Sequence, residues 1–321
     1  TAVSSHSYSS LGELRKDGFD SVVAAIGVFD GIHLGHRKLL TELCEMAERH
    51  SAHPVAITFY PHPRVLVDPK SAPELLLPPE EKVRLLKAYG AETVVTIPFT
   101  KSFAALSPDD FLNNCLFSGE IAVKGICVGK NWKFGARAAG NTAFLEEYAN
   151  RKQFDFCPVK ELKTPDGMII SSSAVRKAVS EGKLTLAESM LGRHYALYGT
   201  VERGYRMATE TLEAPTANLR TEWGVIPPNG VYAAFVWIDG KRYSAAVNIG
   251  VSPTFRSIYG SISRRIEIHV LDGFQENLYD KYLSLELAAF IREETAFPSP
   301  EALKKQIRLD LCRITEILKR S

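Results

Sequence analysis

The feature that most constrains the fold is the alternation of short apolar runs with helical patterns in the first half of the chain. Apolar, β-rich runs lie at residues 22–28, 55–59, 93–97 and 121–128. Residues 80–86 and 108–115 between them have the apolar spacing of helices. Strands that alternate with helices pair in parallel and carry the helices on the faces of the sheet. Right-handed crossovers then bring the loops after the strands to one edge, where ligands bind.

The second half of the chain has a different pattern. Residues 231–238 and 242–247 flank Asp239-Gly240, which predicts a hairpin. Two further segments, 265–271 and 283–290, alternate apolar and polar residues as half-buried antiparallel strands do. A closing helix is expected from Ser299-Pro300 onward. We therefore expect an α/β domain over residues 1–190 and a mostly β domain with a terminal helix over residues 191–321.

Composition excludes several classes of protein and partner. The 321 residues include 39 Lys and Arg and 37 Asp and Glu, which gives a formal charge of +2. This charge lacks the basic excess that nucleic-acid-binding proteins have. No stretch approaches the roughly 18–20 apolar residues that span a bilayer. The five cysteines are odd in number and scattered, which indicates neither a disulfide framework nor a zinc site. We expect a cytoplasmic protein with small-molecule partners, and a homo-oligomer is left open.

The segment from Gly27 to His36 lies between the first expected strand and the first expected helix. Its three glycines allow the backbone to approach a ligand closely. The helix that follows offers free N–H groups and the positive end of its dipole to an anion. Because His33 and His36 are three residues apart, both can face the same phosphate. They would donate hydrogen bonds to oxygens whose charge grows in a transition state.

These residues carry a family resemblance. The H-x-G-H of His33–His36 resembles the nucleotidyltransferase superfamily. Four further motifs follow in order along the chain: Phe59-Tyr60-Pro61-His62-Pro63, the segment 98–111, the segment 128–140, and Ile170-Ser171-Ser172-Ser173-Ala174-Val175-Arg176. Together they resemble the bacterial bifunctional riboflavin kinase/FMN adenylyltransferase family, over nearly the whole chain. The resemblance implies a Rossmann-like nucleotidyltransferase domain followed by an antiparallel β-barrel riboflavin kinase domain with a terminal helix.

The resemblance also implies roles for residues of the first domain. His33, His36 and Arg176 would act on the ATP phosphates. The remaining ATP-binding residues would be Gly27, Phe29, Asp30, Gly35, Asn131, Ser172 and Ser173. His62, Pro63, Phe99 and Phe111 would lie on the flavin side, although core packing explains any single phenylalanine equally well.

A second set of motifs resembles riboflavin kinases. Pro215-Thr216-Ala217-Asn218 matches P-T-A-N, in which Thr216 and Asn218 would bind Mg²⁺ that comes with ATP. Glu267 falls where the family has its catalytic base, and a carboxylate there could take the proton of the riboflavin 5′-hydroxyl. Asn248 and Arg292 match the positions that contact nucleotide or flavin. The implied activities are phosphorylation of riboflavin to FMN and adenylyl transfer from ATP to FMN, which gives FAD and pyrophosphate.

This sequence departs from the family pattern at three places. Val28 replaces an asparagine, Ser173 replaces a threonine, and residues 205–214 contain no glycine where the kinase normally cradles a triphosphate. A glycine-poor loop with Glu210 and Glu213 is poorly suited to that task. The alternative is therefore an FMN adenylyltransferase with a degenerate, flavin-binding kinase domain. A flavin- or nucleotide-binding protein without turnover is a third hypothesis, which the two histidines and Arg176 disfavour.

Overall fold

The computed structural model describes residues 7–202, 216–256, 262–271, 273–274 and 277–320. The chain divides into two compact units. The first comprises Thr1–Pro73 and Pro79–Ser171, and the second comprises Glu74–Pro78 and Ser172–Ser321.

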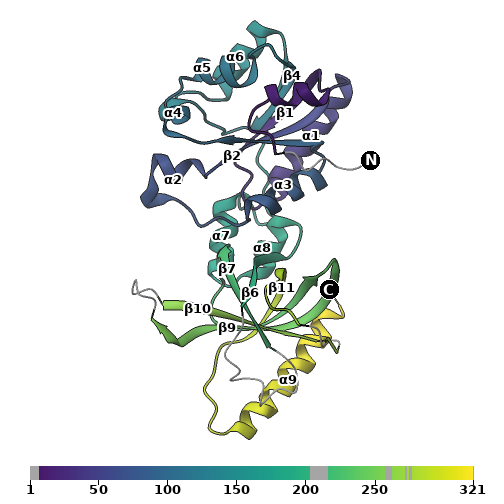
Figure 1. Cartoon of the computed structure of the whole chain (residues 1–321), viewed down its shortest axis with the longest axis vertical. Coiled ribbons are helices and arrows are strands. Elements are labelled where there is room, and N and C mark those ends of the chain that lie inside the picture. Colours follow the sequence, from purple (N-terminus) through teal and green to yellow (C-terminus); the bar gives the residue numbers. More distant parts are fainter. Residues whose placement is uncertain (1–6, 203–215, 257–261, 272, 275–276, 321) are drawn as a thin grey trace. The chain divides into compact units, whose positions relative to one another are not determined.

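The first unit, which includes β1, β2 and β4 in Figure 1, is built on a parallel sheet. The sheet has five strands in the order β3-β2-β1-β4-β5. Its strands are β1 (Ser21–Ile26), β2 (His53–Tyr60), β3 (Thr93–Pro98), β4 (Ala122–Gly129) and β5 (Asp155–Val159). The four strands expected from the apolar runs are confirmed. The pattern missed β5, which is short, contains Pro158 and has a single buried residue, Val159.

Helices connect these strands as the alternation predicts. The α-helices are α1 (Leu34–Arg49), α2 (Pro63–Val67), α3 (Pro79–Ala88), α4 (Lys101–Ala104), α5 (Pro108–Phe111) and α6 (Thr142–Lys152). Short 3-10 turns occupy Gly12–Asp17, Pro69–Ser71 and Ala136–Ala138. The helix expected at 108–115 is present as α5 and a following π-helical turn, Leu112–Leu116.

The core of the first unit lies on both faces of the sheet. In β1 every residue from Val22 to Ile26 is at most 1% exposed, as expected for a central parallel strand. One side chain row, Val22, Ala24 and Ile26, belongs to a cluster with Leu112 and Leu145. The helix α1 packs on β1, β2, β4 and β5.

The second unit begins with α7 (Ser172–Ser180) and α8 (Leu184–Leu191) and continues into a closed six-stranded antiparallel barrel. The strand order is β10-β7-β6-β11-β8-β9. Its strands are β6 (Tyr195–Glu202), β7 (Thr216–Trp223), β8 (Gly230–Ile238), β9 (Lys241–Arg256), β10 (Ile262–Val270) and β11 (Tyr282–Arg292). The predicted fold class, a parallel α/β unit followed by an antiparallel barrel with a terminal helix, is confirmed.

Local sequence signals explain two features of the barrel unit. Asp239 and Gly240 both have positive φ, 48° and 79°, as a two-residue type I′ hairpin turn requires. The terminal helix α9 (Pro300–Leu318) begins where Ser299 accepts a 3.2 Å hydrogen bond from the N–H of Ala302. Its apolar side packs on the barrel in a cluster of Ala233, Phe235, Ile291, Ile314 and Leu318. None of the described helices combines the length and apolar character needed to span a bilayer.

Candidate functional site

The first candidate site lies at the carboxyl edge of the parallel sheet. The sheet order changes direction between β1 and β4, and ligands of open α/β sheets bind at such a switch point. The segment Gly27–His36 follows β1, and Asn131 follows β4. His62 and Phe99 come directly after β2 and β3. Parallel strands therefore bring the first-domain residues of this unit to one edge.

The two histidines of this site stack on each other. Their ring centroids are 3.7 Å apart at an interplanar angle of 17°. His33 is the N-cap of α1, and its Nδ1 accepts a 3.3 Å hydrogen bond from the backbone N–H of His36. An accepting Nδ1 carries no proton, so neutral His33 has its proton on Nε2. The cap therefore fixes the ring orientation and places the ring proton of neutral His33 on Nε2.

The packing of the His33 ring explains why residue 35 is a glycine. A Cβ at this position would lie 3.1 Å from two atoms of the His33 ring, Cε1 and Nδ1. A larger residue would therefore displace the ring that caps the helix.

The backbone before the histidines is held in an uncommon conformation. Phe29 and Ile32 are fully buried with φ of 54° and 39°, a region that non-glycine residues rarely adopt. Asp30 between them is only 4% exposed. Gly27 and Phe29 are close enough that a Cβ on Gly27 would lie 3.3 Å from the Phe29 ring.

Sequence reasoning missed Lys82, which is buried near this segment. The lysine lies on α3, is 8% exposed, and donates a 3.3 Å hydrogen bond from Nζ to the carbonyl oxygen of Val28. Burial lowers the pKa of Lys82 to about 8, and the nearby Asp30 carboxylate acts in the opposite direction. The available signal was its helical spacing, because Lys82 lies three and four residues before the buried Leu85 and Leu86.

The aromatic residues expected on the flavin side form a connected chain. Ring centroids lie 5.3 Å apart for Phe99 and Phe103, and 5.8 Å apart for Phe103 and Phe111. Phe111 is 3% exposed and belongs to the core, whereas Phe99 and Phe103 are partly buried at its margin. His62 caps α2 by accepting a 3.1 Å hydrogen bond from the Arg64 N–H, with Pro63 as the first helical residue.

The other first-domain residues lie apart from the histidine segment in the chain. Asn131 is exposed and donates a 2.7 Å hydrogen bond to Oε1 of Glu161. Ser172 and Ser173 are the first two residues of α7, in the second unit. Arg176, on the same helix, donates a 2.8 Å hydrogen bond from Nε to the carbonyl of Glu74.

The second candidate site is a row of polar residues across three neighbouring barrel strands. Glu267 on β10 is the register partner of Asn218 on β7 and of Asn248 on β9. Because register partners point to the same side of a sheet, all three side chains share one face. The neighbours Ile266 and Ile268 are buried on the opposite face, inside the barrel. The barrel therefore unites three residues that are up to 49 positions apart in the sequence.

Arg265 binds two members of this row. Its Nε donates a 3.0 Å hydrogen bond to Oδ1 of Asn218, and its guanidinium forms an ion pair with Glu267. Burial lowers the pKa of Arg265. Thr216, the other expected Mg²⁺ ligand, pairs with His269 on β10, two positions along from Asn218.

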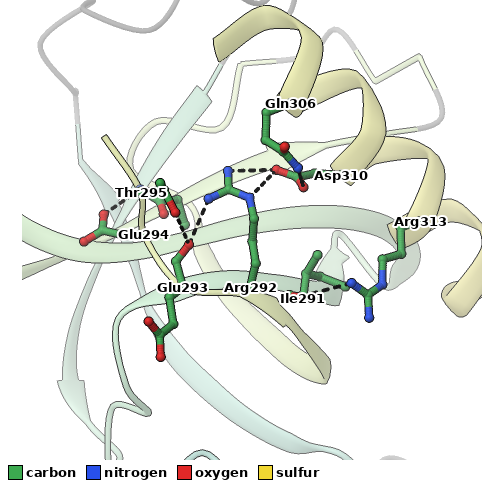
Figure 2. Close-up of polar contacts among 9 residues, drawn as sticks. Ile291, Arg292, Glu293, Glu294, Thr295, Gln306, Asp310 and Arg313 are labelled. Carbon is green, nitrogen blue, oxygen red and sulfur yellow. Dashed lines mark hydrogen bonds and ion pairs between the residues drawn. The ribbon is translucent and has the colours of Figure 1, made fainter. Parts of the chain in front are cut away.

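Arg292 is engaged within the protein. Figure 2 shows its guanidinium directed at Asp310 of α9, with Nε and Nη2 at 2.9 and 2.8 Å from Oδ2. Nη1 donates a 2.9 Å hydrogen bond to the carbonyl of Glu293. Gln306 donates to the second oxygen of Asp310 at 2.8 Å, and Asp310 is 7% exposed. This network attaches the end of β11 to the terminal helix.

Two kinase motifs meet beside this network. Asn248 donates a 3.4 Å hydrogen bond from Nδ2 to Oε1 of Glu294. Gly250 allows the approach, because a Cβ there would collide with the Glu294 carboxylate. The glycine-free segment 205–214, with Glu210 and Glu213, lies outside the described residues. A cavity of about 360 Å³ next to its flanking strands is lined by Glu202, Arg220, Trp223 and Tyr282, among others.

The fold and these two sets of residues define a class of two-unit transferase, with a nucleotidyltransferase-type α/β unit and a flavokinase-type barrel. Sequence comparison agrees with each half. The model of the FAD synthetase family matches residues 16–174, and that of the riboflavin kinase family matches residues 191–318.

Whole-chain relatives have both halves. A protein of Buchnera aphidicola is 32% identical over 90% of this chain and 91% of its own, and one of Escherichia coli K12 is 34% identical over 91% of each. Both are named bifunctional riboflavin kinase/FMN adenylyltransferase. The chain therefore belongs to the bifunctional riboflavin kinase/FMN adenylyltransferase family.

A solved structure has a similar fold over most of its length. It is described as a macrolide-efflux protein from Streptococcus pneumoniae and is 26% identical in sequence. The match has a TM-score of 0.79 and covers 92% of this chain and 95% of that one.

Proposed function

We propose that this chain phosphorylates riboflavin to FMN with ATP in its barrel unit and transfers the adenylyl group of a second ATP to FMN at its histidine segment. The products of the second reaction are FAD and pyrophosphate. We assign adenylyl transfer to residues 1–190 and riboflavin phosphorylation to residues 191–321. The observation that carries the proposal is the row Asn218–Glu267–Asn248, because it unites residues from three separate kinase motifs.

In the adenylyl-transfer site, His33 and His36 would bind the phosphates of ATP. A donor from Nε2 of His33 and the N-terminus of α1 both stabilise the negative charge that grows on phosphate oxygens during transfer. Gly27, Phe29, Asp30 and Gly35 would shape the segment, and Asn131 would position the nucleotide. Ser172, Ser173 and Arg176 would contribute hydroxyl and guanidinium donors to the triphosphate.

On the flavin side, the partly buried Phe99 would contact the ring, together with His62 and Pro63 at the start of α2. Phe111 is core, so we propose a supporting role for it, through its contact with Phe103.

In the kinase site, Glu267 would accept the proton of the riboflavin 5′-hydroxyl as that oxygen attacks the γ-phosphate. The residues around Glu267 suit a divalent cation, because they offer amide and carboxylate oxygens. Two of these oxygens, on Asn218 and Glu267, already contact the positively charged Arg265 guanidinium. Thr216 and Asn218 would hold Mg²⁺, which when bound neutralises charge on the transferred phosphate. The cavity lined by Trp223 and Tyr282 would receive the nucleotide base.

We assign Arg292 a positioning role. The Arg292 guanidinium donates to Asp310 of α9 and to the Glu293 carbonyl just after β11. These bonds would orient residues 293–299, which connect β11 to α9. Flavin would contact this segment.

The test is a product assay. The protein is incubated with riboflavin, ATP and Mg²⁺, and riboflavin, FMN and FAD are separated by chromatography beside an FMN-plus-ATP control. FMN and FAD from riboflavin are expected. FAD from added FMN alone would favour the adenylyltransferase with a degenerate kinase domain, and product in neither reaction would favour the binding protein without turnover.

A further inference from the structure

Lys82 is a buried cation in a place that neither set of family motifs includes. It belongs to α3, yet only 8% of its surface is exposed. Removing an ammonium group from water is unfavourable, and the lowered pKa of about 8 reflects that cost. The charged group acting on it from another segment is Asp30, while Glu81 of its own helix pairs with Arg84 at 2.8 Å.

The contacts of Lys82 are with the start of the histidine segment. Its Nζ lies 3.3 Å from the carbonyl oxygen of Val28, and the buried Thr58 on β2 donates to the same oxygen at 3.1 Å. Two donors from two elements therefore hold one carbonyl. Another hydrogen bond, 3.1 Å from the N–H of Gly27 to the carbonyl of Ile57, ties the preceding residue to β2.

The held carbonyl immediately precedes the strained part of the segment. Phe29 at φ 54° and Ile32 at φ 39° have backbone conformations that persist only where surrounding contacts enforce them. For the β-branched Ile32 the conformation is especially unfavourable. His33, which caps α1 and stacks on His36, is the next residue.

We propose that Lys82 is a positioning residue for adenylyl transfer: by holding the Val28 carbonyl it keeps residues 28–32 in their strained conformation, and so sets the His33–His36 pair against the ATP phosphates. The inference rests on the proposed adenylyl transfer at these histidines. Lys82 also places positive charge behind a segment that receives an anion. Because the anchored atom belongs to the backbone, the valine at position 28 does not impair the anchoring.

The experiment compares three variants of the full chain. Lys82→Met keeps the length of the side chain without its donor, Lys82→Arg restores a cation, and Lys87→Met removes a half-buried lysine of the same helix. FAD formation from FMN and ATP is measured for kcat and for the KM of ATP. Riboflavin phosphorylation in the same preparations reports on the integrity of the chain.

We expect Lys82→Met to lower kcat for FAD formation on the order of 10²-fold, because misplaced catalytic groups cost about this much. The KM of ATP should change far less, since the histidines act mainly in the transition state. Riboflavin phosphorylation should be unchanged, Lys82→Arg should recover part of the rate, and Lys87→Met should match the wild type.

Wild-type kcat should also fall as the pH rises through the range in which Lys82 loses its proton, because the neutral amine is a weaker donor to the Val28 carbonyl and no longer places positive charge behind the segment. Lys82→Arg should move that fall to higher pH. This comparison decides the matter if Lys82→Met does not fold, because an unmoved profile would overturn the proposal. Unchanged kcat in Lys82→Met, or equal loss of both activities, would overturn it as well. If the wild type forms no FAD from FMN, it is the proposed function that fails.

Discussion

Arg265 on β10 donates a 3.0 Å hydrogen bond to the Oδ1 of Asn218 on β7, an oxygen that we assign to Mg²⁺. The same guanidinium pairs with Glu267, the proposed base. The Asn218 oxygen is therefore shared between a fixed cation and the cation that the kinase reaction brings.

Replacing Arg265 should strengthen divalent cation binding at the kinase site. In Arg265→Ser, removal of the competing positive charge should tighten Mn²⁺ binding in the presence of ADP by about tenfold, equivalent to ~1.4 kcal/mol. Titration calorimetry or the spectrum of bound Mn²⁺ measures this without turnover. Arg308→Ser on the exposed side of α9 is the control. Weaker binding in Arg265→Ser would mean that the guanidinium orients Asn218 for the metal.

Loss of the Glu267 carboxylate should stop the kinase alone. Glu267→Gln should lower kcat for FMN formation by about 10²–10⁴-fold, the usual contribution of a general base. FAD formation from added FMN should be unaffected. Glu316→Gln, at an exposed pair with Arg320, should change neither rate. A normal kinase rate in Glu267→Gln would remove this residue from the base role.

Loss of the His36 imidazole should have the opposite selectivity. His36→Ala should reduce FAD formation from FMN by about 10²–10³-fold, because a transition-state donor is lost. FMN formation from riboflavin should continue. The matched control is His50→Ala at the other end of α1, where the ring pairs with Asp155. Loss of both activities in His36→Ala would contradict independent sites.

The pair between Arg292 and Asp310 should be important for the stability of the barrel unit. Asp310→Asn leaves the largely buried Arg292 guanidinium without its charged partner, which typically costs about 3–5 kcal/mol. Urea unfolding followed by tryptophan fluorescence, together with the loss of kinase activity, measures the change. Glu316→Gln should cost at most about 0.5 kcal/mol, as exposed helical pairs do. Equal effects of the two substitutions would show that the network is not structural.

Lys82 should make stability depend on pH in a defined direction. Its folded-state pKa of about 8 is below the unfolded value, so its contribution to folding is fully present above that unfolded value and is lost as the pH falls through 8. At pH 7 the charged Lys82 lowers the free energy of unfolding by roughly 3 kcal/mol, and the hydrogen bond to Val28 offsets part of this loss. Lys82→Met should therefore unfold at higher urea than the wild type at pH 7, and the difference should shrink by pH 10. A variant less stable than the wild type at pH 7 would contradict this balance.

Some of the fold and site could be predicted because the signals are local. The apolar runs of β1 to β4, the Asp239-Gly240 turn and the Ser299 cap each act within a few residues, and the structure confirms all of them. The short strand β5 was not predicted, because its partly exposed, proline-containing sequence lacks the apolar pattern of a buried strand. Motif resemblance identified Glu267 and Asn218 but could not say that they are register partners.

The sequence by itself determined the order of strands and helices, the composition of the phosphate-binding segment and the identity of the kinase motifs. Tertiary structure decided which of these residues share a face and which are buried. Closure of the barrel unites Asn218, Glu267 and Asn248 in one row, and it directs Arg292 to Asp310 on a helix 18 residues later. Packing of α3 buries Lys82 against Val28, 54 residues earlier in the chain. The physical reason is that hydrogen-bonding propensity and turn chemistry act between neighbours, whereas register, burial and desolvation depend on segments that meet only when the sheet and the barrel form.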